Sequence, residues 1–566
     1  MKGIIFILLL IYTISGSAQN KYFATPIKIP IHLSASFGEL RSNHFHSGID
    51  IKTQGITGIP VNAAADGFIS RIVVSPTGYG NALYIDHPNG TTTVYGHLSK
   101  FREDIQEYVR NIQYKNKSFR IDVAVPPDIF PVLQNEIIAE SGDTGSSGGP
   151  HLHFEIRDTK TEEPLNPLKY NLPVSDKTPP RIFSLLVEPL SETSHVNYST
   201  HKKVYPVVLY EGKYHISKNP VIPVYGKIGF AVQANDYFDN SWNKCGIYSL
   251  ELFIDEVRHF SFQMDRFSFD KTRYINSFID YEMYIDKNRR FQKTWIDPGN
   301  KLSIYKFVIN RGIINVKDEK IHQIKIVLKD TYGNTSDLEF NVKGSFHDVK
   351  TPVEKFTSKF RFDEYNEWQN NQFQIEIPKG ALYTNLNFQY KEIPSDDYFS
   401  AIHLVDKNTV PLQENAIVKI KTQNLPESLY SKALVVNVDT LNGKMYAAGG
   451  TFKDGWVGAK IGYFGNYAVT VDIEPPSIVP LSIKDKNTLT EPNQIRFKID
   501  DDLAGIDTYE GTIDGKWVLF EYDLKNKLIY YTFDKKRFEM NKHHILVLTV
   551  TDNKGNSSEY EATFWK

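Results

Sequence analysis

The stretch His151-Leu152-His153-Phe154-Glu155-Ile156 decides the fold of the N-terminal part of this chain. Polar and apolar residues alternate along it, and alternate residues of a β-strand share one face. One face is therefore apolar, and the other carries two imidazoles and a carboxylate. Such a polar face on a half-buried strand is costly unless its groups are paired or bind a metal ion. The stretch thus predicts a strand that lines a functional site.

A second cluster of the same residue types, His46-Ser47-Gly48-Ile49-Asp50, lies far upstream. Histidine and carboxylate ligands suit Zn²⁺, and a vacant fourth position makes such a site catalytic. Counting alone does not separate these histidines from ordinary surface or turn histidines, because the chain has 16 histidines and 67 acidic residues. The alternation around His153 favours the metal site.

The sequence between the two clusters predicts short strands separated by Gly, Asn and Pro turns. We expect strands at 67–74, 82–85 and 92–95, with a hairpin turn at Pro88-Asn89-Gly90 between the last two. Apolar residues recur at helical spacing from Phe101 to Ile112, which predicts one helix after Ser99. This helix lies in a long connection that could form a wall of a substrate groove or cover it.

A repeat organises the C-terminal part of the chain. The matching pairs are Pro179-Pro180 with Pro475-Pro476, Gly246-Ile247 with Gly505-Ile506, and Asp330 to Asn334 with Asp552 to Asn556. The order predicts two related β-sandwiches, each with an Asp and Gly-Asn hairpin before its last strand, and they resemble bacterial immunoglobulin-like modules. The expected domains are a signal peptide (1–18), a catalytic domain (19–175), Ig-like sandwiches (176–348 and 474–566) and a β-rich accessory domain (349–473).

The first residues predict export. Lys2 precedes an apolar run from Ile4 to Ile14, and Gly16-Ser17-Ala18 supplies small residues for cleavage, which is a secretory signal peptide pattern. A retained anchor is the alternative, although the run is short for a membrane span. We expect a periplasmic, envelope or secreted protein without a transmembrane segment after cleavage.

Composition limits the function further. The 566 residues call for several domains, and 13% aromatics with 35 Gly and 28 Pro favour a mainly β fold. Lys+Arg 65 against Asp+Glu 67 leaves no basic field, so we expect no nucleic-acid partner. The single cysteine, Cys245, excludes an intrachain disulfide and a cysteine-based zinc ribbon.

The first unit resembles the M23 (LytM/lysostaphin-type) zinc metallopeptidases over about residues 35–170. The motifs that carry the resemblance occur in the family's order: His46 to Ile51, Pro60 to Gly67, Gly78-Tyr79-Gly80-Asn81, Asp86 to Gly90, Tyr95-Gly96-His97-Leu98, and the glycine-rich stretch that ends in His151 to Glu155. The resemblance implies an antiparallel β metallopeptidase domain.

It also implies roles for five residues. His46, Asp50 and His153 match the family's zinc ligands, with one Zn²⁺ per chain and water in the fourth place. His97 and His151 match two histidines that flank the metal without binding it. They would orient or deprotonate the water and stabilise the tetrahedral oxyanion.

Four other polar residues lie in or near these motifs. Glu155 is either a residue that orients a zinc ligand or an ordinary strand-face carboxylate. Arg41 either binds a substrate carboxylate or is a solvated surface arginine. His44 matches no family position, and His87 is expected at a structural turn. The histidines beyond residue 172, including His543 and His544, are expected at the surface.

The function that follows is an exported zinc metalloendopeptidase, a hydrolase of cell-wall peptidoglycan. Metal-activated water would cut stem peptides or cross-links, without a covalent intermediate. The alternative is a non-catalytic or latent M23-like module that binds the wall or activates another hydrolase. The C-terminal β-domains would position the enzyme or bind envelope proteins. Truncation at about residue 175 is expected to reveal latency.

Overall fold

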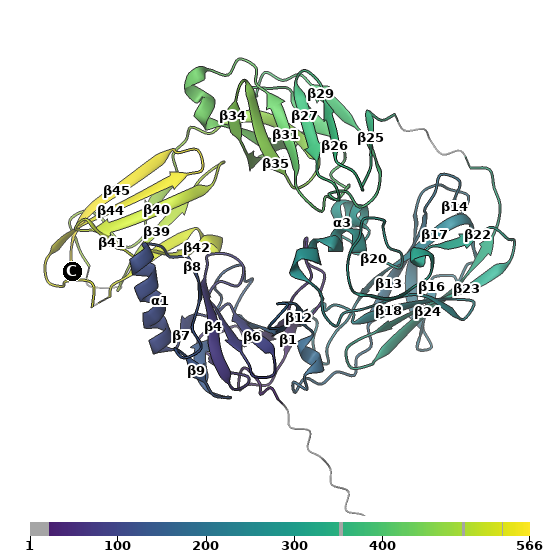
Figure 1. Ribbon diagram of the computed structural model, residues 1–566, viewed down its shortest axis with the longest axis horizontal. Coiled ribbons are helices and arrows are strands. Elements are labelled where there is room, and N and C mark those ends of the chain that lie inside the picture. The colour runs from purple at the N-terminus through teal and green to yellow at the C-terminus, as the bar shows by residue number, and fades with distance from the viewer. Residues whose placement is uncertain (1–21, 350–354, 490–492, 535) are drawn as a thin grey trace, which may run out of the picture.

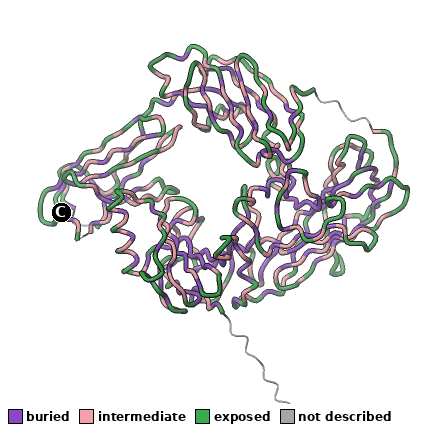
Figure 2. Tube along the Cα trace, in the orientation of Figure 1, coloured by how far each residue is buried: buried purple, intermediate pink, exposed green. Residues whose placement is uncertain are grey.

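The computed structural model describes residues 22–349, 355–489, 493–534 and 536–566. The predicted signal peptide lies outside these ranges. The fold is mainly β, and four β-rich units follow one another around a circuit, so that the fourth lies beside the first (Figure 1). Buried residues concentrate inside each unit (Figure 2). Within the described ranges, no helix is both long and apolar enough to cross a membrane.

The first unit contains a nine-stranded antiparallel sheet whose central path runs β1-β2-β11-β6-β5-β4-β8. The predicted strands at 67–74, 82–85 and 92–95 are confirmed, and the last two pair as a hairpin. A three-stranded sheet, β3-β10-β7, accompanies it. The strands are β1 (Leu33–Ala35), β2 (Ile49–Lys52), β3 (Pro60–Asn62), β4 (Gly67–Val74), β5 (Ala82–Asp86), β6 (Thr91–Gly96), β7 (Lys100–Phe101), β8 (Ile121–Ala124), β9 (Pro131–Val132), β10 (Ile137–Glu140), β11 (His151–Asp158) and β12 (Pro164–Leu165).

The predicted helix is confirmed as α1 (Glu103–Asn116). Ile105 and Val109 are buried on its inner side and belong to the core of the first unit. Its other side contacts the fourth unit, where the Lys536 ammonium lies 2.9 Å from the Glu107 carboxylate. Tyr114 and Trp517 also meet edge to face across this contact, 5.2 Å apart. The insertion that carries α1 therefore serves as a docking surface for the C-terminal unit.

The second unit is a twelve-stranded system in which β17 pairs with both β13 and β24, so that the path β17-β13-β15-β16-β24 closes on itself. Two short helices, α2 (Ile275–Phe278) and α3 (Tyr281–Lys287), interrupt the strands. The strands are β13 (Arg181–Pro189), β14 (His195–Val196), β15 (Lys203–Tyr210), β16 (Lys213–Ile216), β17 (Ile222–Asn235), β18 (Ser249–Ile254), β19 (Val257–Gln263), β20 (Gln292–Lys293), β21 (Tyr305–Val308), β22 (Ile314–Val316), β23 (Ile321–Lys329) and β24 (Thr335–Gly344).

The first two units share a core. Phe45 of the first unit is buried and packs against Phe267 and Phe278 of the second, with ring centroids 5.5 and 5.7 Å away. Its backbone N–H also donates to the Thr272 hydroxyl at 2.8 Å. Because Phe45 directly precedes His46, the second unit fixes the backbone that carries one candidate ligand.

The third unit has two five-stranded sheets and a small two-stranded one around a main core, and a smaller cluster of buried residues accompanies it. Its strands are β25 (Ser358–Phe360), β26 (Asn366–Gln369), β27 (Phe373–Ile377), β28 (Leu386–Phe388), β29 (Tyr390–Ile393), β30 (Ile402–Val405), β31 (Ala416–Lys421), β32 (Ala433–Val438), β33 (Met445–Gly449), β34 (Thr451–Lys453), β35 (Trp456–Ile461) and β36 (Gly465–Val471).

The fourth unit has one four-stranded and one five-stranded sheet. The repeat's predicted hairpins are confirmed: Asp330 to Asn334 connects β23 to β24, and Asp552 to Asn556 connects β44 to β45, each before the last strand of its unit. The strands are β37 (Ser477–Pro480), β38 (Asn487–Thr488), β39 (Gln494–Asp500), β40 (Ile506–Ile513), β41 (Lys516–Val518), β42 (Glu521–Asp523), β43 (Leu528–Thr532), β44 (His543–Asp552) and β45 (Ser557–Trp565).

Candidate metal centre

Strand pairing brings the two histidine clusters together. β2 and β11 are antiparallel neighbours, and Asp50 stands opposite His153 in their register. His46 lies in the segment that leads into β2. Gly48 permits the close approach, because a Cβ there would lie 2.3 Å from the carbonyl oxygen of Phe154. The close approach of β11 therefore requires a glycine at position 48, between the candidate ligands His46 and Asp50.

Three donor atoms converge at this junction. His46 Nε2 lies 3.1 Å from Asp50 Oδ1 and 3.1 Å from His153 Nδ1, and His153 Nδ1 lies 2.9 Å from Asp50 Oδ1. All three side chains are buried. A tetrahedral ion with ligands at about 2.0–2.1 Å has edges of about 3.3 Å, so this triangle is close to the size that zinc needs.

The outer nitrogens of the two imidazoles define the character of this triangle. His46 Nδ1 lies 2.9 Å from the Ser36 carbonyl oxygen, and His153 Nε2 lies 2.7 Å from Glu155 Oε1. Both partners only accept hydrogen bonds, so each outer nitrogen carries a proton. In their neutral form, the two rings therefore turn the lone pairs of the inner nitrogens toward each other and toward the Asp50 carboxylate. Three such acceptors need a positive charge between them, and two nitrogens with one oxygen suit Zn²⁺.

The electrostatics of the cluster also favour a cation. Burial alone would lower the pKa of His153, but its hydrogen bonds to Asp50 and Glu155 outweigh burial and raise the pKa to about 9. Burial opposes ionisation of Asp50 as well, yet the charge of His46 and hydrogen bonds from the histidines hold its pKa well below its usual range. Both shifts favour a positive charge at the inner nitrogens, beside the Asp50 carboxylate.

Glu155 is the centre of a second layer of contacts. It is fully buried, and its Oε1 accepts hydrogen bonds from the Ser47 and Tyr79 hydroxyls, each at 2.6 Å, besides the contact with His153. Its Oε2 accepts from Arg157 Nε at 2.6 Å. Glu155 is therefore not a solvent-facing strand carboxylate. Sequence analysis missed Ser47, Tyr79 and Arg157, although Arg157 continues the alternation of the strand by two residues.

The two flanking histidines also face the cluster. His151 Nδ1 lies 2.8 Å from the Gly149 carbonyl oxygen, and His97 Nδ1 lies 2.8 Å from that of Thr144. Each ring thus carries a proton on Nδ1, and the His151 Nε2 is 3.4 Å from Asp50 Oδ1. Burial, followed by the charges of His153 and His151, lowers the pKa of His97 to about 3, so this imidazole is neutral near pH 7.

Of the remaining sequence candidates, Arg41 lies at the cluster, whereas His44 and His87 bond elsewhere. Arg41 Nη2 lies 3.5 Å from Asp50 Oδ2, so the arginine sits beside a candidate ligand. His44 is exposed and bonds only locally, to the Ser42 carbonyl oxygen. His87 is buried away from the cluster and bonds Asp66 O and Thr93 Oγ1, as expected of a structural residue.

The loop that supports both flanking histidines is held by the fourth unit. This loop, residues 142–149, provides the carbonyl groups to which His97 and His151 bond. Lys525 of the fourth unit makes an ion pair of 2.7 Å with Asp143 Oδ2 and donates hydrogen bonds to the carbonyls of Asp143 and Ser147. The C-terminal unit is thereby coupled to the position of the two flanking histidines.

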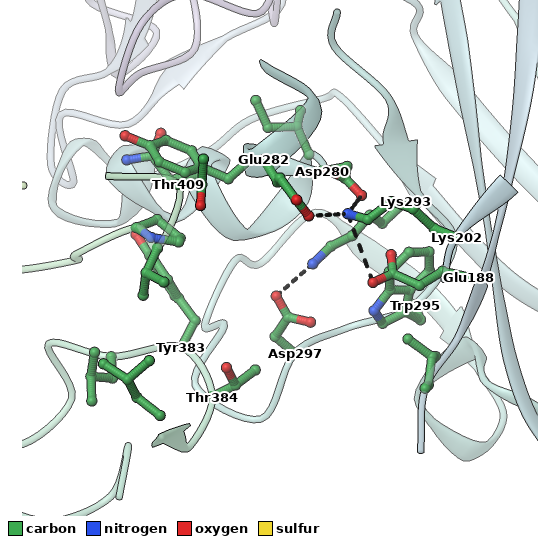
Figure 3. Close-up of a pocket in the computed structure, with 18 residues that line it drawn as sticks. Glu188, Lys202, Asp280, Glu282, Lys293, Trp295, Asp297, Tyr383, Thr384 and Thr409 are labelled. Atoms are coloured by element: carbon green, nitrogen blue, oxygen red, sulfur yellow. Dashed lines mark hydrogen bonds and ion pairs between the residues drawn. The ribbon is translucent and has the colours of Figure 1, made fainter. Parts of the chain in front are cut away.

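A pocket between the second and third units lies apart from this cluster (Figure 3). Its charged groups are paired with one another: Lys202 contacts Asp280 at 2.6 Å and Glu282 at 3.0 Å, and Lys293 contacts Asp297 at 2.5 Å. The pocket therefore belongs to the interface between the units.

The prediction that every later histidine lies at the surface is wrong. His195, His403 and His544 are buried. His403 is stacked on Phe373 at 5.1 Å, and burial lowers its pKa to about 4. His544 packs against Phe538 at 4.4 Å while its Nδ1 bonds Asp514. These imidazoles pack as flat rings within aromatic clusters. Their partners are distant or irregularly spaced in the sequence, so no local pattern predicts this packing.

Comparison with known proteins agrees with the geometry. The family described as Peptidase family M23 matches residues 44–114, and the Zu5-like domain family matches residues 357–472. The DD-carboxypeptidase/endopeptidase Mpg of Neisseria meningitidis serogroup B (strain ATCC 13091 / M2091) is 36% identical over 139 residues, covering 25% of this chain and 26% of that protein. The peptidoglycan DD-endopeptidase ShyA of Vibrio cholerae is 27% identical over 169 residues, covering 29% and 33%.

Among solved structures, a zinc-containing peptidase from Vibrio cholerae is 26% identical, with a TM-score of 0.19, over 26% of this chain and 39% of that one. The matched part thus spans about a quarter to a third of the two curated relatives' own lengths.

Proposed function

Since the N-terminal unit carries a peptidase family M23 domain, we propose that this protein is an exported zinc endopeptidase that hydrolyses peptide bonds of peptidoglycan stem peptides or cross-links. The activities in the names of the Neisseria and Vibrio relatives support this substrate class. The proposal extends them to a chain that matches those proteins over 25–29% of its length.

The observation that carries the proposal is the triangle of three acceptor atoms from His46, Asp50 and His153. These residues would hold one zinc ion per chain. When bound, zinc supplies a water of lowered pKa and polarises the scissile carbonyl. Glu155 keeps the His153 ring in the tautomer that binding requires, which is the usual role of a carboxylate behind a ligand.

His151 and His97 have different roles in this proposal. Each has its Nδ1–H tied to a carbonyl oxygen, which leaves Nε2 free of that proton. The His151 nitrogen accepts a proton from the attacking water and, once protonated, donates a hydrogen bond to the tetrahedral oxyanion. A positioned donor of this kind lowers the activation free energy by about 3 kcal/mol. The lowered pKa of His97 keeps that ring neutral, so it orients the water by accepting a hydrogen bond.

Digestion of purified peptidoglycan by the full chain, followed by mass spectrometry of the muropeptides, tests the proposal and identifies the scissile bond. We expect peptide cleavage that a chelator abolishes and zinc restores. His153→Ala should lose both zinc and activity, whereas His44→Ala, an exposed histidine close to His46, should keep both. Zinc retained at wild-type stoichiometry in His153→Ala would refute the ligand assignment.

A second candidate is a latent form of the same enzyme, which the contacts of the fourth unit favour. Lys525 binds the loop that supports both flanking histidines, and Arg41 sits against Asp50. In this alternative, an envelope partner that displaces the C-terminal unit frees the loop. Lys525→Ala would then raise the hydrolysis rate of the full chain, and Lys527→Ala, which removes a neighbouring lysine that pairs with Asp500, would not. Equal rates in both variants and wild type would contradict latency through this contact.

A further inference from the structure

Three buried aspartates meet where the first unit joins the second. Asp176 lies in the linker, Asp236 follows β17, and Asp330 follows β23, and they are only 7%, 3% and 2% exposed. One carboxylate oxygen from each lies within 4.8 Å of the other two. None of them contacts the histidine cluster of the first unit in the interactions described above, so they form a separate site.

The charges around this triad oppose one another. Burial, and then the charges of Asp330 and Asp176, raise the pKa of Asp236 to about 8. Burial likewise raises the pKa of Asp176 to about 7, with further contributions from Asp330 and from Asp239. Each carboxylate of the triad thus lies close to other carboxylates. This arrangement destabilises the ionised forms unless a positive charge lies among them.

Two oxygens of the triad have no hydrogen-bond partner among the described residues. They are Asp236 Oδ1 and Asp176 Oδ2, and both atoms are fully buried. A buried polar atom without a partner is destabilising, and more so when it is charged. By contrast, Asp330 is fixed by the N–H groups of Tyr332 and Asn334 and by the Asn334 side chain. The rigid Asp330 carboxylate and the two oxygens without a hydrogen-bond partner therefore favour a cation as their common partner.

The fourth unit repeats the arrangement at its own linker. Asp472, Asp501 and Asp552 occupy the equivalent positions and also lie within 4.8 Å of one another. Asn556 bonds Asp552 Oδ2 at 2.7 Å and the Asp472 carbonyl at 3.0 Å, as Asn334 bonds Asp330 and Asp176 at 2.6 and 3.2 Å.

The two triads differ in the groups around them. Tyr332 of the second unit corresponds to Lys554 in the fourth, whose charge acts on Asp472 and Asp552 while its ammonium bonds the carbonyl oxygens of Ala433 and Gly450. Backbone N–H groups also satisfy the fourth unit's carboxylates: those of Leu503 and Gly505 donate to Asp501 Oδ2, and that of Ala504 donates to Asp472 Oδ2. The triad of the second unit is the stronger candidate for an external cation.

We propose that Asp176, Asp236 and Asp330 bind a divalent cation that prefers oxygen ligands, with Ca²⁺ as the best fit. Calcium takes carboxylate oxygens at about 2.3–2.6 Å, so its ligands lie up to about 5 Å apart, which matches the spread of this triad. The all-oxygen donor set differs from that of the histidine site, so the two sites select different metals.

Such an ion would tie the linker to two loops of the second unit. Asp176 comes from the chain that leaves the first unit, whereas Asp236 and Asp330 come from the body of the second. Binding would therefore order the linker and fix the first unit on the second, on which the backbone before His46 depends.

Isothermal titration calorimetry of CaCl₂ into the chelator-treated, zinc-reloaded full chain tests the inference. We expect saturable binding in wild type, at least a tenfold loss of affinity in Asp236→Asn, and wild-type affinity in Asp501→Asn, the same substitution in the equivalent triad. If Asp236→Asn does not fold, Asp176→Asn in the linker takes its place, with the same loss expected.

Three outcomes would overturn the inference. They are no binding of Ca²⁺ or Mg²⁺ to wild type, unchanged affinity in the folded Asp236→Asn or Asp176→Asn variant, and an equal loss in Asp501→Asn. A more stable Asp236→Asn without any calcium response in wild type would show that the triad holds protons instead.

Discussion

Replacing Glu155 by glutamine separates two roles of one buried carboxylate. The amide keeps the size of the side chain but removes the charge that faces the buried Arg157 guanidinium and the His153 ring. Removing one partner of a buried ion pair costs about 3–5 kcal/mol, because the other charge remains buried. Removing a carboxylate behind a metal-binding histidine lowers metal affinity by about 10–100-fold.

Hydrogen exchange measures the first effect. No tryptophan lies within residues 19–175, so tryptophan fluorescence does not report on this unit. Hydrogen exchange of the β11 amides in metal-free protein does report on it. A loss of 3–5 kcal/mol corresponds to about 10²–10⁴-fold faster exchange where that strand opens with the unit. Zinc competition with a fluorescent chelator measures the second effect.

The double variant Glu155→Gln/Arg157→Gln provides the control. It removes both charges of the pair, so we expect it to recover most of the lost protection. Its zinc affinity should stay low, because His153 still lacks its carboxylate. Recovery of wild-type zinc affinity in the double variant would refute the claim that Glu155 acts through His153, and unchanged protection in the single variant would refute the claim that the ion pair stabilises β11.

Three further results are expected. His151→Ala should keep zinc and lose most peptidoglycan hydrolysis, measured by muropeptide release; near wild-type turnover would deny it a catalytic role. Phe45→Ala should destabilise the shared core of the first two units by about 3–5 kcal/mol and weaken zinc binding, measured by denaturation and metal competition. Glu107→Lys and Lys536→Glu should each loosen the fourth unit from α1, measured by cross-linking or small-angle scattering, and the double reversal should restore docking; independent effects would exclude the pairing.

Local patterns predicted the elements that carry the candidate site. The alternation along residues 151–156 placed two imidazoles and a carboxylate on one strand face, and the structure has them on β11. The same period includes Arg157, but alternation alone does not show that Arg157 pairs with Glu155 two residues earlier on the strand. The hairpins at Asp330 and Asp552 were predictable because their turn chemistry is local.

Contacts between units were not predictable in this way. Phe45 looks like a residue of the first unit's own sheet, yet its partners are Phe267 and Phe278, more than two hundred positions later. The contacts of the fourth unit with α1 include exposed charged residues such as Lys536, which resemble any solvated lysine in sequence. Long-range packing of this kind leaves no periodic signal in one chain.

These contacts change how latency must be tested. Truncation at about residue 175, the test that the sequence suggests, would remove Phe267 and Thr272 and so expose Phe45 beside His46. A loss of activity in that fragment would report damage to the metal centre and say nothing of latency. The fourth unit contacts the first through α1 and the loop of residues 142–149, without entering the first unit's core cluster. Point variants at Lys525 therefore perturb this contact and leave in place the packing around Phe45 that supports His46.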